Sequence, residues 1–329
     1  MSELIFPDLI FNIIIIGVSF LVLNWASNLV IKNVVKVSTI TRLGKTAIGF
    51  SLIAFSTSLP ELTVALTAAL SGGAALSVGN VLGSNIVNIS VVIGLATFIV
   101  YYKCRRNISF AKSELGSIHF GLFISSIIPM VLIFVSAAAW IVGLVLIAIF
   151  VGYMYNLSKV RMPSENGDVA AEEEKSKLKR YVFFTIVGAL GVVVSAYFLV
   201  ESAVNIAQSV GLSQQVIGAT IIALGTSLPE LTLGLKAILK GHLGLAFGEI
   251  IGSSFINITL ILGISLFVPS LVGSPVTMNM GVFQNLVLFS IITNMVFWYF
   301  LSRGKIGRME GIIFLFIYVL FIVTTIGTM

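Results

Sequence analysis

The sequence predicts an all-α polytopic membrane protein with about ten transmembrane helices, arranged as two inverted-topology repeats of five helices each. Three observations support this prediction. The 329 residues are 58% hydrophobic and only 10% charged. Apolar runs of about 20 residues, each long enough to cross a bilayer as a helix, recur along the chain. A seven-residue string, Thr-Ser-Leu-Pro-Glu-Leu-Thr, occurs twice, at residues 57–63 and 226–232.

The composition excludes several other classes of protein. A soluble domain carries about a quarter charged residues, far more than this chain. The single cysteine, Cys104, excludes an intrachain disulfide framework and a multi-cysteine metal site. The formal net charge of +6 comes from basic residues in short loops between apolar runs, so we expect no nucleic-acid partner. The expected surroundings are a lipid bilayer, with the cell membrane as the location, and no obligate protein partner is evident.

The apolar runs form two groups around one polar segment. The first repeat covers residues 1–157, with spans expected near 9–31, 42–70, 74–100, 115–135 and 137–157. Residues 158–180 contain Pro163, an Asn-Gly pair and three consecutive glutamates, and are interpreted as a cytoplasmic linker. The second repeat covers residues 181–329, with spans expected near 181–209, 214–239, 243–268, 280–302 and 308–328.

Basic residues occur in every second loop. Besides the central linker, the basic loops contain Lys32, Lys36, Arg42 and Lys45; Lys103, Arg105, Arg106 and Lys112; Lys236, Lys240 and His242; and Arg303, Lys305 and Arg308. The positive-inside rule places these loops in the cytoplasm and both termini outside. Because five spans is an odd number, the second repeat enters the membrane in the opposite orientation, as in many secondary transporters. The alternative is a duplicated helical bundle without a transport role.

The two copies of the string belong to a longer internal duplication. Glu61 and Glu230 are 230 − 61 = 169 positions apart, and this offset aligns residues 48–94 with residues 217–263 without a gap. The matched positions include the unusual polar residues of the spans. These are the pairs Pro60/Pro229, Ser84/Ser253 and Asn88/Asn257.

Four acidic residues, Glu61, Glu201, Glu230 and Glu249, fall well within predicted spans. A charge at the centre of a bilayer costs at least about 2.5–3.5 kcal/mol, so such residues are functional by default. No lysine or arginine lies deep in a span to pair with them. We therefore expect the duplicated carboxylates of Glu61 and Glu230 to be neutralised by a cation or by protons.

The residues around each duplicated glutamate favour a hard cation. On a helix, Ala54, Thr57 and Glu61 share one face, with Ser58 beside them. Pro60 cannot donate the backbone hydrogen bond of a regular helix, and its ring distorts the preceding turn. The second copy repeats the pattern. Carboxylates, hydroxyls and loosened carbonyls suit Ca²⁺, Na⁺ and Mg²⁺, whereas the thiolates and imidazoles that favour zinc or copper are absent.

The next span of each half adds a second polar face. Ser84 and Asn88 are four positions apart and point the same way, as do Ser253 and Asn257. Glycines at positions 79, 83, 248 and 252 form GxxxG pairs, which are typical of close helix packing. A single serine or threonine in a span usually bonds to its own helix. The repetition of these residues around a glutamate in both halves is what indicates a site.

These motifs resemble those of the cation/Ca²⁺ exchanger superfamily, and specifically the prokaryotic type of its sodium/calcium exchanger branch. That family carries a G-T-S-x-P-E motif and a G-S-N-type motif on the second and third helices of each half. The matching segments here are residues 56–61 (Ser-Thr-Ser-Leu-Pro-Glu), 83–88 (Gly-Ser-Asn-Ile-Val-Asn), 225–230 (Gly-Thr-Ser-Leu-Pro-Glu) and 252–257 (Gly-Ser-Ser-Phe-Ile-Asn). The ten-span layout extends the resemblance over essentially the whole chain.

The resemblance implies a cluster of ion sites at the middle of the membrane. A Ca²⁺ site would be built on Glu61 and Glu230, with backbone carbonyls near Thr57 and Thr226. The flanking Na⁺ sites would use Ser58, Ser84 and the Ala54 carbonyl, with Ser227, Ser253 and the Ala223 carbonyl as their counterparts, and Asn88 and Asn257 would face the centre. Ca²⁺ and Na⁺ would be transported ions that compete for the same glutamates, and no cofactor is implied. The first and sixth helices would slide across the core to give alternating access.

The chain departs from the family pattern at two places. Potassium-dependent members carry an aspartate at one of the positions of Asn88 and Asn257, so asparagine at both favours potassium independence. Asn80 of the first repeat is matched by Glu249, which shares a helical face with Ser253 and Asn257. Glu249 is interpreted either as part of the inner ion pathway or as a helix-end carboxylate that faces lipid headgroups. Glu201, in the sixth span, has no assigned role.

The predicted function is exchange of Na⁺ for Ca²⁺, with three alternatives. Proton/Ca²⁺ antiporters of the same superfamily resemble G-N-x-x-E at the glutamate positions, in contrast to T-S-L-P-E here. A cation channel is more remote, because channels usually form a symmetric pore by oligomerising. An enzyme is excluded because His119 and His242 lie near span ends, and the sequence contains neither paired intramembrane aspartates nor a GxSxG motif.

Overall fold

The computed structural model describes residues 5–41, 54–104, 108–109, 123, 126–127, 139–159, 177–210, 214–239, 243–273 and 280–327. Within these ranges the chain is helical, apart from short turns and two strands of two residues each. Strand β1 (Ile108–Ser109) pairs antiparallel with β2 (Lys305–Ile306), with Ile108 opposite Ile306. The prediction of an all-α membrane fold is confirmed, with this small strand pair as an addition.

The internal duplication is also visible in the bounds of the helices. In the first repeat they are α1 (Ile5–Thr41), α3 (Ala54–Thr57), α4 (Leu59–Leu70), α5 (Ala74–Val87), the π-helix η2 (Asn88–Val92), α6 (Ile93–Cys104) and α8 (Ala139–Lys159). In the second they are α10 (Leu178–Val210), α11 (Gln214–Ile217), η4 (Gly218–Ile222), α12 (Ala223–Thr226), α13 (Leu228–Leu239), α14 (Leu243–Ile256), η5 (Asn257–Ile261), α15 (Leu262–Leu271), α16 (Met280–Ser302) and α17 (Arg308–Gly327). From α3 to η2, every helix begins and ends 169 positions before its counterpart from α12 to η5.

Six of the described helices are long and apolar enough to cross a bilayer, and one bent pair makes a seventh candidate. Two shorter apolar helices, Leu59–Leu70 and Trp140–Tyr155, coincide with the second and fifth predicted spans. The predicted fourth span near 115–135 lies almost wholly outside the described residues, as do residues 160–176 of the linker, Arg42, Lys45, His119 and His242. The total of ten spans therefore stays a prediction.

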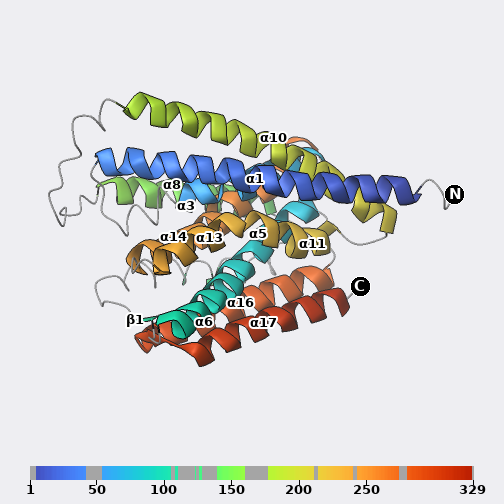
Figure 1. Ribbon diagram of the computed structural model, residues 1–329. Coiled ribbons are helices and arrows are strands. Elements are labelled where there is room, and N and C mark those ends of the chain that lie inside the picture. The colour runs from blue at the N-terminus through green and yellow to red at the C-terminus, as the bar shows by residue number, and fades with distance from the viewer. Residues whose placement is uncertain are drawn as a thin grey trace.

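Helices α1 and α10, the first spans of the two halves, lie side by side and run in opposite directions (Figure 1). Asn205, late in α10, donates a hydrogen bond to Asn12, early in α1, at 3.4 Å. Gly188, early in α10, lies against Ala26 and Val30, which are later in α1. The beginning of each helix therefore lies beside the end of the other. Because these antiparallel helices are the first spans of the two repeats, the repeats have opposite orientations.

The long α1 helix extends about ten residues beyond the predicted first span, because no glycine or proline interrupts residues 18–43. It begins on the side of the molecule where α17 ends, to the right in Figure 1. The ends of α1 and α6, and the starts of α10 and α17, which adjoin predicted basic loops, lie together on the opposite side (Figure 1). The helix ends are therefore arranged as the alternation of loop charges requires.

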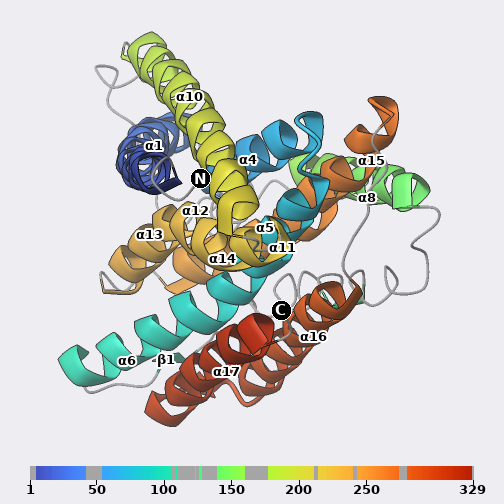
Figure 2. The ribbon, with the colours of Figure 1, turned by 90° about the vertical axis from the view of Figure 1, so that its right-hand side faces the viewer.

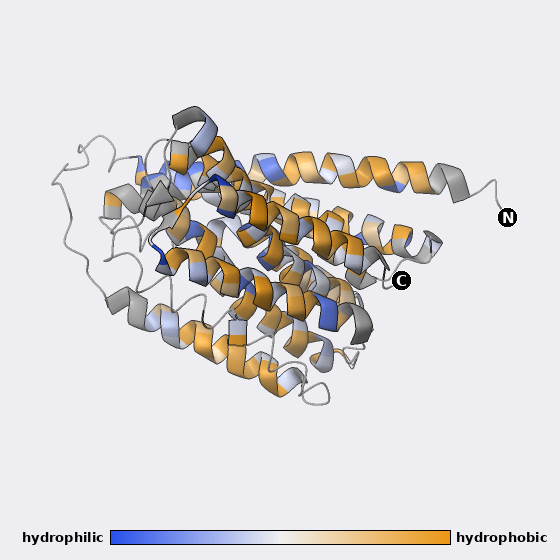
Figure 3. Ribbon diagram, turned by 90° about the horizontal axis from the view of Figure 1, so that it is seen from below, coloured by the Kyte–Doolittle hydropathy of each residue, from blue (hydrophilic) through white to orange (hydrophobic). Residues whose placement is uncertain are grey.

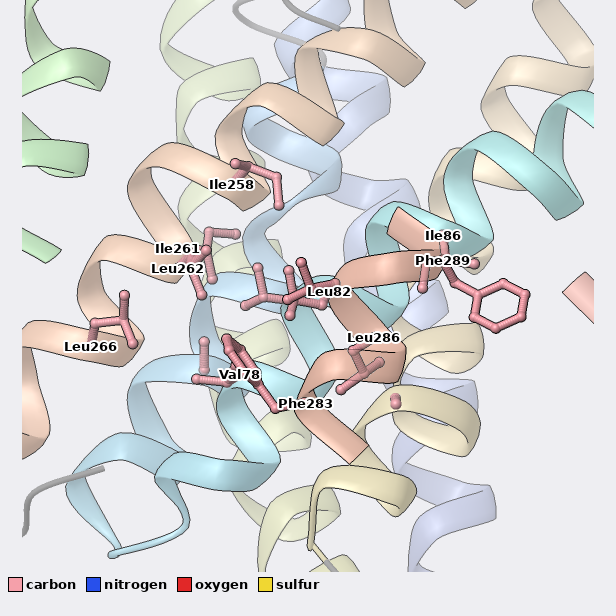
Figure 4. Packing of buried hydrophobic residues seen from close by; sticks show 14 of the residues in the cluster. Val78, Leu82, Ile86, Ile258, Ile261, Leu262, Leu266, Phe283, Leu286 and Phe289 are labelled. Carbon is pink, nitrogen blue, oxygen red and sulfur yellow. The ribbon is translucent and has the colours of Figure 1, made fainter. Parts of the chain in front are cut away.

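Helices α5 and α14 occupy the middle of the bundle, between the α1–α10 pair and helices α16 and α17 (Figure 2). Val78, Leu82 and Ile86 of α5 pack against apolar residues of η5, α15 and α16 (Figure 4). By contrast, α1 and α10 expose large apolar side chains, and α1 is apolar along most of its length (Figure 3). An apolar exterior around a core that also holds polar residues is what a bilayer requires of a helical bundle.

Candidate functional site

Both copies of the repeated string interrupt a helix. Thr57 ends α3, Ser58 is a single turn residue, and Leu59 begins α4. The second copy has the same break between α12 and α13, where the helix axis bends by 45°. The break occurs because a proline follows at the second position of each new helix, where its missing N–H is tolerated. Glu61 and Glu230 consequently lie in the first turn of a helix, where the dipole favours negative charge.

The two glutamates are completely buried and have no cationic partner among the described residues. One carboxylate oxygen of Glu61 accepts a hydrogen bond from Ser227 at 3.4 Å, and one of Glu230 accepts from Ser253 at 3.2 Å. The second carboxylate oxygen of each makes no hydrogen bond with the described residues. The two carboxylates are close enough for their charges to repel. A buried, unpaired charge is costly unless a counter-ion or a proton compensates it.

Serine hydroxyls join the two repeats beside the glutamates. The Ser58 and Ser253 hydroxyls are 2.9 Å apart, and those of Ser84 and Thr226 are 3.4 Å apart. Asn88 Nδ2 donates to Ser253 Oγ at 3.2 Å. Each of these contacts joins a residue of the first repeat to a residue of the second. The motifs of the two halves therefore form one polar cluster.

The two threonines of the strings make equivalent contacts. Thr57 Oγ1 lies 3.0 Å from the Ala54 carbonyl and 3.3 Å from a carboxylate oxygen of Glu249. Thr226 Oγ1 lies 3.4 Å from the Ala223 carbonyl and 3.3 Å from Asn80 Oδ1. The pseudo-symmetry that relates the strings therefore also relates Glu249 to Asn80.

The carbonyls of Ala54 and Ala223 accept hydrogen bonds within their own segments. The Ala54 carbonyl accepts from Ser58 N at 2.9 Å, and the Ala223 carbonyl accepts from Ser227 N at 3.1 Å. Each also lies within reach of the threonine hydroxyl described above. An ion bound through either carbonyl would therefore share it with these donors.

All twelve site residues predicted from the sequence are buried, and most are linked by hydrogen bonds between the repeats. They are Ala54, Thr57, Ser58, Glu61, Ser84, Asn88, Ala223, Thr226, Ser227, Glu230, Ser253 and Asn257. Asn257 differs from the others, because neither its amide nitrogen nor its oxygen makes a hydrogen bond with the described residues.

Asn80 and Glu249 were not among the predicted ligands, yet both contact the threonines of the site. Glu249 is completely buried, so the interpretation as a headgroup-facing carboxylate is wrong. Its helical face, shared with Ser253 and Asn257, was the sequence signal that places it in the cluster. Glu201, in contrast, is exposed on α10.

The donor set fits a hard cation that is held largely by neutral oxygens. Hydroxyl, amide and carbonyl oxygens surround the two carboxylates, and such ligands suit Ca²⁺ and Na⁺. Among the described residues, no three His, Cys, Asp or Glu side chains are close enough to hold one metal ion together. The carboxylate oxygens that make no hydrogen bond with the described residues are the atoms available to an ion.

Known proteins that are similar to this chain include two that are named as sodium/calcium exchangers. A protein of Methanocaldococcus jannaschii named uncharacterized membrane protein MJ0091 is 32% identical over 277 residues, which are 83% of this chain and 84% of that protein. The sodium/calcium exchanger MaX1 of Methanosarcina acetivorans is 28% identical and covers 95% of this chain and 97% of its own. A solved structure of the sodium-calcium exchanger NCX_Mj superposes with a TM-score of 0.70 at 26% identity, over 96% of this chain and 99% of that one.

The match to a protein family covers both repeats. The family described as sodium/calcium exchanger protein matches residues 11–159 and 180–327. These segments include both copies of the string and both polar faces that meet at the buried glutamates. The chain therefore belongs to the sodium/calcium exchanger protein family.

Proposed function

We propose that the chain is a secondary active antiporter that exchanges Na⁺ for Ca²⁺ by alternating access, with both ions competing for a site built on Glu61 and Glu230. The observation that supports this most directly is the pair of buried carboxylates, each with one oxygen that has no partner among the described residues. Two negative charges balance one Ca²⁺, and they equally balance two Na⁺ ions. The family membership supports cation/Ca²⁺ exchange in general.

Coupling to sodium is favoured by the hydroxyls around the glutamates. Ser58, Ser227 and Ser253 supply neutral oxygens beside the carboxylates, which a dehydrated Na⁺ needs and a proton does not. Two of the most similar proteins are named for sodium and calcium. Coupling to protons is the second candidate, since a buried carboxylate can also be neutralised by protonation.

Alternating access is supported by the inverted repeats. Helices α1 and α10 pair with each other along their length, and polar contacts between the repeats lie in the core beside them. We propose that this pair slides across the core and exposes the site to one side of the membrane at a time. The proposed orientation has the basic loops in the cytoplasm of the cell and both termini outside.

The test is ⁴⁵Ca²⁺ uptake into proteoliposomes that are loaded with Na⁺ and diluted into Na⁺-free buffer. We expect uptake driven by the Na⁺ gradient, and we expect the Glu61→Gln/Glu230→Gln double variant to abolish it. Glu201→Gln is the matched control, because it removes an exposed membrane carboxylate outside the polar cluster. Uptake that responds only to a pH gradient would contradict sodium coupling, and no uptake under either gradient would contradict Ca²⁺ antiport.

A further inference from the structure

Helix α16 carries a buried asparagine that the polar cluster does not account for. Asn294 is completely buried, and neither its side-chain nitrogen nor its oxygen makes a hydrogen bond with the described residues. Thr293, beside it, donates its hydroxyl to the Phe289 carbonyl of the same helix. Burying an amide, which can both donate and accept, is unfavourable when it has no partner. Such a group in a native fold needs an explanation, and ordered water is a common one.

Another buried polar atom that makes no hydrogen bond with the described residues lies nearby, on the central helix α5. Asn85 Nδ2 donates to Ser290 Oγ of α16 at 2.8 Å, whereas Asn85 Oδ1 makes no hydrogen bond with those residues. Ser290 precedes Asn294 by four positions, so both lie on one face of α16, with Cβ atoms about 5–6 Å apart. All three side chains are completely buried.

The spacing of these groups suits one bridging molecule. The Asn85 amide contacts Ser290, which is one helical turn from Asn294. Two successive hydrogen bonds of about 2.9 Å span a gap of this size, so a small molecule between the helices can reach both amides. The atoms that need partners are two oxygens, which accept, and one nitrogen, which donates.

Water matches these atoms better than an ion does. A cation would bind the two amide oxygens but would leave Asn294 Nδ2 without an acceptor, and an anion would leave both oxygens without a donor. Asn85, Ser290 and Asn294 carry no charge that could balance either kind of ion. Water both donates and accepts, and buried waters in proteins make about three hydrogen bonds to groups of this kind.

Apolar side chains make up the neighbouring part of the contact between α5 and α16. Val78 and Leu82 of α5 pack with Phe283 and Leu286 of α16 (Figure 4). Such a contact excludes water but does not by itself fix the rotation of a helix, because the hydrophobic effect is non-directional. Asn85 adds a directional bond to this contact and therefore restricts the rotation of α5 about its own axis.

The rotation of α5 matters because another side of this helix faces the candidate site. Ser84, directly before Asn85, lies 3.4 Å from Thr226, and Asn88 donates to Ser253 at 3.2 Å. Both Ser84 and Asn88 are expected ion ligands. A change in the hydrogen bonds of Asn85 would therefore turn these two side chains relative to the second repeat.

We propose that Asn85, Ser290 and Asn294 bind an internal water molecule between α5 and α16, and that this water positions Ser84 and Asn88 at the proposed ion site. Asn85 and Asn294 are then positioning residues, which do not contact the transported ions. The water-binding site is independent of the proposed exchange function, whereas its role in positioning rests on that function. Separate experiments test the two parts.

Hydroxyl-radical labelling by brief synchrotron irradiation tests for the water directly, because bound water is activated where it lies and modifies the nearest side chains. Phe297 is completely buried and follows Asn294 by three positions on α16. We expect Phe297 to be modified in the wild type and unmodified in Asn85→Leu/Asn294→Leu. Phe321, equally buried but in α17, is the control and should stay unmodified. An unmodified Phe297 in the wild type, or modification that persists in the double variant, overturns the water site.

A double-variant cycle of thermal unfolding in detergent measures the bridge in a second way. Asn294→Leu keeps a similar shape but leaves Asn85 Oδ1 without its water, so we expect a lower unfolding midpoint. The double variant with Asn85→Leu should lose less than the sum of the two single losses, although the two amides share no direct hydrogen bond. Asn285→Leu is the control: it removes a direct bond from α16 to Thr325 and should combine additively with Asn85→Leu. A raised midpoint for Asn294→Leu, or additive losses in the first cycle, overturns the bridge.

The positioning role is tested by Na⁺-driven ⁴⁵Ca²⁺ uptake at varied Ca²⁺ concentration. We expect Asn294→Leu to raise the Ca²⁺ concentration for half-maximal uptake severalfold, because displaced ligands bind more weakly. Asn294→Ser, which keeps a hydroxyl for the water, should restore the wild-type value. A merely structural role would lower the maximal rate through loss of folded protein and leave the half-maximal concentration unchanged, and that result overturns the positioning role.

The outcomes distinguish the water site from the proposed function. Absence of Na⁺-driven uptake in the wild type overturns the proposed exchange, and the positioning role with it, while labelling of Phe297 and the thermal cycle still decide the water site. If the leucine variants fail to fold, the smaller apolar valine replaces leucine in each of them. Labelling of Phe297 against Phe321 in the wild type needs no variant.

Discussion

Gly225 illustrates how closely the helices pack around the broken helix of the second repeat. A Cβ atom at this position would overlap the ring of Phe20, so the ring or its helix would have to move. Phe20 belongs to α1, and Gly225 belongs to α12, just before the bend. The contact therefore joins the proposed sliding helix to the segment that carries the proposed ion site.

Gly225→Ala is expected to displace α1 and lower the stability of the protein by about 2 kcal/mol, a usual cost of overpacking a core. Thermal unfolding in detergent measures the change. Gly17→Ala, in the helix α1 that also carries Phe20 but with nothing within 4 Å of the added atom, is the control and should be neutral or slightly stabilising. Adding Phe20→Ala to Gly225→Ala should remove the steric conflict; a double variant no better than the single one would contradict this explanation.

Ser58→Ala and Ser227→Ala are expected to weaken the binding of Na⁺ more than the binding of Ca²⁺. Each removes a neutral oxygen beside a glutamate but leaves both carboxylates in place. Loss of one such contact is worth about 1 kcal/mol, or roughly a fivefold rise in the Na⁺ concentration for half-maximal inhibition of Ca²⁺ uptake. Ser71→Ala, at an exposed serine after α4, is the control. Equal loss of affinity for both ions would contradict a specific role in Na⁺ binding.

At the scale of whole elements, the site depends on helices that are broken at matching places. The breaks after Thr57 and Thr226 turn two potential spans into pairs of shorter helices. The π-helices that begin at Asn88 and Asn257 add a second irregularity at matching positions in the following spans. Such single-turn π segments often lie at functional sites.

Pro229→Ala should restore a backbone donor at the bend and allow α12 and α13 to join into a straighter helix. We expect Na⁺-driven Ca²⁺ uptake to fall severalfold, with thermal stability unchanged or increased. Pro269→Ala is the matched control, since Pro269 is also buried inside a helix but belongs to α15, outside the polar cluster. Full transport activity in Pro229→Ala would show that the bend is not required.

The breaks could be predicted from the sequence, and the π-helices could not. A proline within an apolar run fixes the place where a helix is interrupted, so Pro60 and Pro229 marked the breaks directly. The π segments contain ordinary residues such as Ile89 and Ile258. Their extra residue per turn depends on packing against other helices, which the linear sequence does not display.

At the scale of the whole molecule, the 169-residue offset predicted the repeats, and the loop charges predicted their inversion. Only the structure shows which helices of one repeat pack against which helices of the other. Glu249 illustrates what the sequence alone could not predict. The sequence placed it on the same helical face as Ser253, but it did not distinguish between the inner ion pathway and the lipid headgroups as its surroundings. Its burial against Thr57 and Gly234 depends on how α14 packs with α3 and α13, and that packing involves residues far apart in the chain.

Cross-linking should distinguish the helices that move together from those that move apart. In a Cys104→Ala background, a cross-link between Asn12→Cys and Asn205→Cys joins α1 to α10 and should preserve Ca²⁺ uptake, because the proposed motion carries both helices. A cross-link by a short bifunctional reagent between Phe20→Cys and Gly225→Cys joins α1 to the site segment and should stop uptake. Uptake by the same two double variants before cross-linking is the control. Arrest by the first link, or continued uptake with the second, would contradict the sliding pair.

The difference between Asn80 in the first repeat and Glu249 at the equivalent position of the second also bears on the proposed alternating access. It affects the balance between the inward-open and outward-open conformations when no ion is bound. In a protein built from two identical inverted halves, a two-fold rotation would convert the inward-open form into the outward-open form. The two forms would then have equal energy, and neither would be preferred in the absence of ions. Each residue that differs between the halves removes part of that degeneracy. Under the proposed alternating access, a buried carboxylate in one half alone, with glycine opposite it, would give the ion-free molecule a preference for one of the two conformations before any gradient acts on it.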